Sequence, residues 1–175
     1  MTYDALPLKD EVLTLRRLRQ DDLEAFQSYR TDPDIARLQG WSIASDAESL
    51  EFLERMHAIA HFVPDQWFQL GVALTRSDHL IGDVGVCLES SGRAQIGYSI
   101  HAAHQRRGYG SRAVELAIAY IFAASDAREV VAFADVRNEA SWRLLERVGM
   151  TRREKRRAVY DGEMCEEYGY GLSRR

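Results

Sequence analysis

Residues 105–110 read Gln-Arg-Arg-Gly-Tyr-Gly and join a strand-like run, Gln95 to Ile100, to a helix-like run, Ser111 to Ala124. Glycines at such a junction let the backbone approach a bound anion without side chains in the way. The first N–H groups of the helix, together with its dipole, can then bind a pyrophosphate. The stretch therefore predicts a site for a nucleotide-like cofactor at the start of this helix.

Two common phosphate-binding loops do not fit this stretch. A Walker loop requires Gly-Lys followed by Ser or Thr, whereas Ser111 follows Gly110 with no lysine before it. A Rossmann loop requires three spaced glycines after the first strand of a parallel unit, with an acidic residue about 20 positions later. Here the loop follows a fourth predicted strand and has two glycines. The sequence therefore argues against both nucleotide classes.

Hydrophobic periodicity predicts one α/β domain, over residues 8–173, in which a central mixed sheet is flanked by helices. The continuous β-branched run at 129–136 indicates a strand that is covered on both faces. Pro33 is suited to the first turn of a short helix, and Gly149 to the end of another. The other expected elements are strands at 12–17, 67–74, 80–88, 95–100, 152–160 and 165–172, and helices at 21–29, 45–61, 110–124 and 139–148.

The composition of this 175-residue chain limits its expected cellular location and the ligands that it is expected to bind. No apolar run approaches the roughly 20 residues that span a membrane, and the N-terminus lacks the apolar core of a secretory signal, so a cytoplasmic location without membrane contact is expected. The net charge of −4 argues against a nucleic-acid binder. The basic segment 152–157 keeps an RNA contact open, although a solvated edge strand is favoured. The two cysteines form no CxxC pair and no zinc motif is visible, so we expect no metal.

The loop and its neighbours resemble the acetyl-CoA loop of the GCN5-related N-acetyltransferase (GNAT) family, whose pattern is Gln/Arg-x-x-Gly-x-Gly/Ala. The resemblance runs from Leu13 to about Leu172 and is strongest to the branch that acetylates N-termini of ribosomal proteins. Three further segments carry it: Ile-Gly-Tyr at 96–98, Asn-Glu-Ala-Ser at 138–141 and Glu-Arg-Val-Gly-Met at 146–150. It implies the GNAT fold.

The resemblance also implies an activity, which is direct transfer of an acetyl group from acetyl-CoA to a primary amine without a covalent enzyme intermediate. The acceptor would be a protein N-terminus or a small amine such as an aminoglycoside or polyamine. An acyl-CoA-binding regulatory module without catalysis is an alternative, because a fold alone does not establish function. A homodimer is also compatible with the resemblance.

The resemblance places the donor on the glycine loop and on the strand before it. Residues 98–100 would pair with the pantetheine arm like an added strand, where this strand splays from the strand at 129–136. The N–H of Ile100 would stabilise the oxyanion of the thioester. The complete set of expected cofactor contacts is Tyr98, Ser99, Ile100, Gln105, Arg106, Arg107, Gly108, Tyr109, Gly110, Ser111, Asn138 and Ser141.

The expected acid and base depart from the family pattern. Many relatives have an acidic tyrosine seven residues after the asparagine, but Leu145 stands there, so Ser141 is the expected acid, unless it is only a small helix residue. Relatives also have a glutamate where this chain has Gln95. Glu89 is the expected base, with Glu166 and Asp83 as alternatives, although each also fits an ordinary solvated carboxylate.

The acceptor side should include the first helices and the last hairpin. Trp41, next to Gly40 in a predicted loop, is the expected acceptor-binding residue, because exposed loop aromatics often bind ligands. Phe52, Trp67 and Tyr160 are further aromatic residues of these regions. A weakly basic acceptor is favoured, because an α-amine with a pKa of about 7.7–8.0 needs less help from a base than a lysine at about 10.4.

Overall fold

A computed structural model describes residues 5–39, 41–160 and 162–175 and contains a single mixed sheet. The strand order is β1-β2-β3-β4-β5-β6-β8-β7. The strands are β1 (Leu8–Lys9), β2 (Leu13–Arg17), β3 (Trp67–Leu74), β4 (Leu80–Leu88), β5 (Arg93–Ile100), β6 (Glu129–Asp135), β7 (Thr151–Tyr160) and β8 (Glu163–Ser173). The α-helices are α1 (Leu23–Arg30), α2 (Pro33–Gln39), α3 (Asp46–Ala58), α4 (Tyr109–Ala124) and α5 (Glu139–Arg147). The predicted class and order of elements are confirmed, and β1 is the strand that the sequence did not predict.

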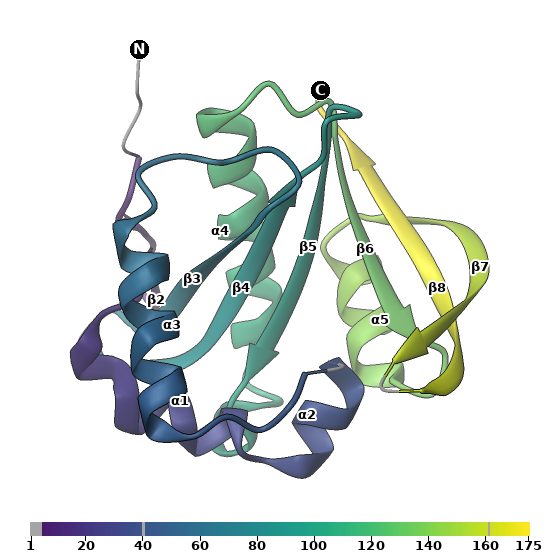
Figure 1. Cartoon of the computed structure of the whole chain (residues 1–175). Coiled ribbons are helices and arrows are strands. Elements are labelled where there is room, and N and C mark those ends of the chain that lie inside the picture. Colours follow the sequence, from purple (N-terminus) through teal and green to yellow (C-terminus); the bar gives the residue numbers. More distant parts are fainter. Residues whose placement is uncertain (1–4, 40, 161) are drawn as a thin grey trace.

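Helices cover both faces of the sheet (Figure 1). The apolar side of α4 packs behind the central strands and contributes Val114, Ala117 and Ile121 to the main core. Helices α1 and α3 lie in front of β3 and β4, where Phe26, Leu53 and their neighbours form a second, smaller core. The two cores therefore fix the sheet between two layers of helices.

Local sequence signals set most element boundaries. Ser45 caps α3 in a reciprocal pair with Glu48, and Gly149 after α5 has the left-handed φ of 89° expected of a helix end. Helix α3 ends at Ala58, earlier than the predicted His61. The guanidinium of Arg17 donates hydrogen bonds to the carbonyl oxygens of Ile59 and Ala60, and these contacts from a neighbouring strand hold the chain in an extended conformation there.

The basic segment 152–157 lies on β7, which is an edge strand as predicted. Four of its five basic side chains have an acidic partner: Arg152 with Glu146, Arg153 with Glu129, Lys155 with Glu166 and Arg156 with Glu167. Paired cations on an edge strand protect the edge against pairing with another chain. The segment therefore has a structural role, and the alternative of an RNA contact gains no support.

Asp83 on β4 is fully buried between the sheet and α1. Its carboxylate accepts hydrogen bonds from the hydroxyl of Tyr29 at 2.5 Å, from Nε2 of Gln69 at 2.7 Å and from the guanidinium of Arg30 at 3.1 Å. A buried charge needs such partners, because an unpaired one is strongly destabilising. Asp83 thus links α1 to the centre of the sheet, and its carboxylate is fully engaged in hydrogen bonds within the core.

We predict that Asp83→Ala lowers the free energy of unfolding by about 3–5 kcal/mol, because it leaves the largely buried guanidinium of Arg30 without its counter-charge. Urea unfolding followed by circular dichroism measures this change. Glu139→Ala is the control, since it removes an exposed pair with Arg143 and should change the free energy by less than about 1 kcal/mol. Similar losses for the two variants would contradict the prediction.

Candidate active site

The parallel strands β5 and β6 part halfway along their length (Figure 1). Their pairing begins at Arg93 with Glu129 and ends at Ile96 with Ala132. Beyond this point β5 stays paired with β4 as far as Ile100, and β6 stays paired with β8 as far as Asp135. The side of β5 that faces away from β4 over residues 97–100 is therefore left as an open edge in the middle of the sheet.

The backbone polar groups of Tyr98 and Ile100 point toward this open edge. The N–H of His101 donates to the carbonyl of Ile81 at 2.8 Å, and the N–H of Glu89 donates to the carbonyl of Arg93 at 2.8 Å. In an antiparallel ladder alternate residues bond to the same neighbour, so odd-numbered residues of β5 bond to β4 and even-numbered ones face the other way. The open edge thus presents two N–H groups, from Tyr98 and Ile100.

Two glutamine side chains donate hydrogen bonds to the carbonyl groups of the open edge. Nε2 of Gln39, the last residue of α2, donates to the carbonyl of Tyr98 at 2.8 Å. Nε2 of Gln105 donates to the carbonyl of Ile100 at 2.9 Å. The sequence indicated Gln105 but not Gln39, because nothing in the local pattern of α2 points to β5.

The glycine loop bends sharply into α4. Arg106 and Gly108 have left-handed φ values of 60° and 79°, and Gly108 is the N-cap of the helix. A Cβ at Gly108 would meet no atom within 4 Å, so this position faces open space. A Cβ at Gly110 would lie 2.6 Å from Cδ1 of Leu144, so this glycine allows α4 to pack against α5. The first N–H groups of α4 are thus accessible to an anion.

A pair of hydroxyl groups connects β5 to α5, the helix that follows β6. The phenol oxygen of Tyr98 lies 2.8 Å from Oγ of Ser141, in the first turn of α5. Oδ1 of Asn138 accepts a hydrogen bond from the N–H of Ser141 at 3.2 Å and so caps this helix. Burial raises the pKa of Tyr98 above its ordinary value, so the phenol stays protonated and can donate to Ser141. The sequence pointed to the backbone of Tyr98 and missed its hydroxyl.

The three expected base candidates do not join this group. Glu89 lies beyond the end of β4, beside the start of β5, and its carboxylate accepts a hydrogen bond from Nε of Arg93 at 2.9 Å. The structure therefore places Glu89 at the opposite end of β5 from Ile100. Asp83 is engaged in the core, and Glu166 pairs with Lys155 at 2.8 Å on the outer strands. Leu145, where relatives have a tyrosine, is fully buried.

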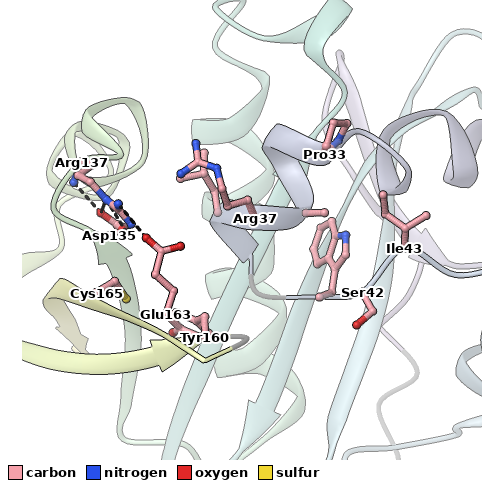
Figure 2. Close-up of a pocket in the computed structure, with 12 residues that line it drawn as sticks. Pro33, Arg37, Ser42, Ile43, Asp135, Arg137, Tyr160, Glu163 and Cys165 are labelled. Atoms are coloured by element: carbon pink, nitrogen blue, oxygen red, sulfur yellow. Dashed lines mark hydrogen bonds and ion pairs between the residues drawn. The ribbon is translucent and has the colours of Figure 1, made fainter.

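A pocket of about 520 Å³ lies between α2 and the last hairpin (Figure 2). The apolar wall comes from α2 and the segment after it, and the opposite wall comes from the end of β6 and the tip of the β7–β8 hairpin. Because α2 carries both Gln39 and pocket residues, the pocket adjoins the open edge. The lining residues are Pro33, Ala36, Arg37, Leu38, Trp41, Ser42, Ile43, Asp135, Arg137, Tyr160, Glu163 and Cys165.

Trp41 lies in the wall of this pocket and is held in place by Arg30. Its indole Nε1 donates to the carbonyl of Arg30 at 3.3 Å, and the guanidinium of Arg30 lies 3.9 Å from the centroid of the ring system. Tyr160 also lines the pocket, whereas Phe52 stacks on Phe26 and Trp67 is exposed on β3. The neighbouring residue Gly40 lies outside the described residues.

The pocket is lined by four charged side chains that the sequence did not indicate as site residues. Arg137 donates hydrogen bonds to both oxygens of Asp135, the shortest at 2.7 Å, and lies 3.4 Å from Oε1 of Glu163 (Figure 2). The bond from Arg137 is the main cause of the lowered pKa of Asp135. Arg37 approaches from α2. The position of Asp135 at the end of a buried strand could have indicated it as a site residue. No local signal in the sequence indicates Arg37, Arg137 or Glu163.

Among the described residues, no three His, Cys, Asp or Glu side chains are grouped so that they could hold a metal ion. None of the described helices combines the length and the apolar composition that crossing a bilayer requires.

The chain is similar to known acetyltransferases in sequence and in structure. "Uncharacterized N-acetyltransferase p20" from Bacillus licheniformis is 25% identical over 141 residues, which cover 79% of this chain and 78% of the relative. The structure of a GNAT-family acetyltransferase from Bacillus anthracis matches with a TM-score of 0.83 and 21% identity, covering 95% of this chain and 97% of that one.

A further structural neighbour was solved with a cofactor. RimL, a ribosomal L7/L12 alpha-N-protein acetyltransferase in complex with coenzyme A, matches with a TM-score of 0.78 and 16% identity, covering 95% of this chain and 97% of that one. Solved GNAT homologues thus hold acetyl-CoA or coenzyme A. The model of the acetyltransferase (GNAT) domain family matches residues 12–151 of this chain, so the protein belongs to the GNAT family of N-acetyltransferases.

Proposed function

We propose that the protein transfers the acetyl group of acetyl-CoA directly to the α-amine of a protein N-terminus. The observation that carries the proposal is the parting of β5 and β6, because the open edge meets the glycine loop on one side and the pocket on the other. The similarity to RimL, which acts on a protein N-terminus, favours this acceptor over a small amine.

The donor would lie along the open edge. The pantetheine arm would bond to the N–H groups of Tyr98 and Ile100 as an added strand does, displacing or sharing the carbonyl contact of Gln39. The pyrophosphate would bind the N–H groups of the loop and first turn of α4, with Arg106 and Arg107 adding positive charge. Gln105, Tyr109, Ser111 and Asn138 surround this path.

Chemistry requires a neutral amine, whose lone pair attacks the thioester carbon and forms a tetrahedral oxyanion. The N–H of Ile100, or that of Tyr98 beside it, would donate to this oxyanion. The attacking nitrogen loses its surplus proton to water, collapse of the intermediate breaks the C–S bond, and the electron pair leaves with sulfur. Ser141 would donate its proton to the sulfur, while the phenol of Tyr98 donates to Oγ of Ser141 and so directs the serine proton toward the open edge.

The positions of the carboxylates favour a weakly basic acceptor. Glu89, Asp83 and Glu166 are engaged elsewhere, and Asp135 is held by Arg137. Within the part of the chain that the structure describes, the one polar contact of the Glu163 side chain is at 3.4 Å to Arg137, so Glu163 is the pocket carboxylate most able to bind an ammonium group. An α-amine, with a pKa near 7.7–8.0, loses its proton to water near neutral pH, whereas a lysine amine does so rarely.

The first test compares two peptides. We expect a lysine-free peptide with a free α-amine to be acetylated at pH 7 with a kcat/KM at least about tenfold above that of an N-blocked peptide with one lysine, because far more of its amine is neutral. Its kcat/KM should rise about tenfold per pH unit below the amine pKa and level off above it. Release of free CoA measures both. Faster turnover with spermidine or kanamycin than with either peptide would favour the small-amine alternative.

The donor site is tested at Gly108. We expect Gly108→Glu to raise the Kd for acetyl-CoA at least about 100-fold, because a carboxylate would project toward the pyrophosphate and repel it. Titration calorimetry measures the Kd. Gly149→Glu is the matched control, since Gly149 has the same backbone conformation and open surroundings beyond the far end of α5. Equal affinities for the two variants would show that the donor binds elsewhere.

The proposed role of Ser141 as the general acid is tested with variants that each lack one hydroxyl oxygen. Ser141→Ala should lower kcat roughly 100-fold, at the low end for a general acid because a thiolate leaves readily, and Tyr98→Phe roughly tenfold. Because Tyr98 acts through Ser141, the double variant should match Ser141→Ala alone. The Kd for acetyl-CoA serves as the control and should stay within about twofold. Wild-type turnover of Ser141→Ala would reject the acid role.

A further inference from the structure

The charges of the acceptor pocket separate into a satisfied pair and two groups that remain available. Asp135 and Arg137 share several hydrogen bonds, and the Asp135 side chain is only 9% exposed. Such a bidentate pair is the preferred arrangement of a guanidinium and a carboxylate, so these two charges neutralise each other. Of the other two charged side chains, Glu163 makes a long 3.4 Å pair with the already compensated Arg137, and Arg37 is the cation of the pocket that has no ion pair among the described residues.

Arg37 projects from α2 toward the charged wall of the pocket (Figure 2). Its positive charge contributes to the lowered pKa of Asp135, which places its guanidinium near that wall. Among the described residues, Arg37 has no hydrogen bond and no ion pair. Arg37 and Arg137 come from opposite walls of the pocket, which thus holds two positive charges, and that of Arg137 is already compensated by Asp135.

An acceptor that fills this pocket must therefore compensate Arg37. Covering an unpaired guanidinium removes its water and costs free energy unless an anion replaces that water. A polyamine or aminoglycoside would add positive charge beside two arginines, which is unfavourable. A ligand with an ammonium group for Glu163 and a carboxylate for Arg37 would match both free charges.

We propose that Arg37 binds a carboxylate of the acceptor, so that the preferred acceptors are protein N-termini with an Asp or Glu within the first few residues. This inference rests on the proposed N-terminal acceptor and narrows it to one sequence class. The ammonium group lies at Glu163 before it loses its proton, and the acidic side chain extends toward α2. Trp41 and Ile43 form the apolar wall and accommodate an uncharged side chain of the same peptide.

The experiment uses three peptides, Ala-Asp-Ala-Tyr-Ala-Gly and the same peptide with Asn or Lys in place of Asp. Binding to the enzyme loaded with coenzyme A is measured by calorimetry, and kcat/KM with acetyl-CoA is measured separately. We expect wild type to prefer the Asp peptide over the Asn peptide about tenfold in both measurements, as one charge-assisted bond allows. Arg37→Gln should abolish this preference, and Arg37→Glu should shift it to the Lys peptide.

Arg76→Gln is the matched control, because it removes the same charge from an exposed turn between β3 and β4 and should keep the preference. Equal binding of the Asp and Asn peptides by wild type, no binding of any peptide, or an unchanged preference in Arg37→Gln would overturn the inference. Binding of free aspartate in place of every peptide would also overturn it. Binding that depends on Arg37 without any acetylation would uphold the anion site and reject the proposed function instead.

Discussion

Strand β5 cannot remain paired with both of its neighbours, and the rest of the site depends on this constraint. A Cβ at Gly82 of β4 would lie only 2.2 Å from the carbonyl oxygen of Ser99, so the absence of a side chain lets β4 approach β5 closely to its end. Strand β6 follows β8 in the other direction as far as Asp135. Because sheets twist, strands committed to different partners diverge, and here they do so in the middle of the sheet. Unpaired backbone groups normally occur at a sheet margin, where they invite aggregation. In this protein they lie inside the sheet, where β5 leads toward α4 and β6 leads toward α5.

Side chains connect the open edge of β5 to two neighbouring helices. The hydroxyl pair of Tyr98 and Ser141 connects β5 to α5, and Gln39 connects β5 to α2. Each contact is a single hydrogen bond, which a ligand can exchange for one of its own at small net cost. Helix α2 therefore contacts the open edge of β5 through Gln39 and lines the pocket through Arg37, one turn or less apart.

The sequence predicted what is decided locally and missed what is decided by distant contacts. Ser45 with Glu48, and Gly149 with its left-handed φ, mark helix ends through interactions within a few residues. The strand pattern also contained the information that Glu89 is remote, because in an antiparallel hairpin the end of one strand lies beside the start of the next. The pocket gave no such signal: Arg37 and Glu163 come from elements more than a hundred residues apart, and each alone resembles an ordinary surface residue.

This difference explains why a GNAT sequence identifies its donor so readily and its acceptor so poorly. The donor is bound mainly by backbone N–H groups, so its site appears in the sequence as glycines and as the strand–helix junction that exposes those groups. Many side chains are compatible with this geometry, because the contacts come from the backbone. The pocket proposed for the acceptor is lined by side chains that α2, β6 and the last hairpin bring together, and no spacing rule links these elements. Acceptor identity must therefore be inferred from charge and shape in the folded pocket, where Arg37 and the weakly paired Glu163 are the groups that a ligand could bind.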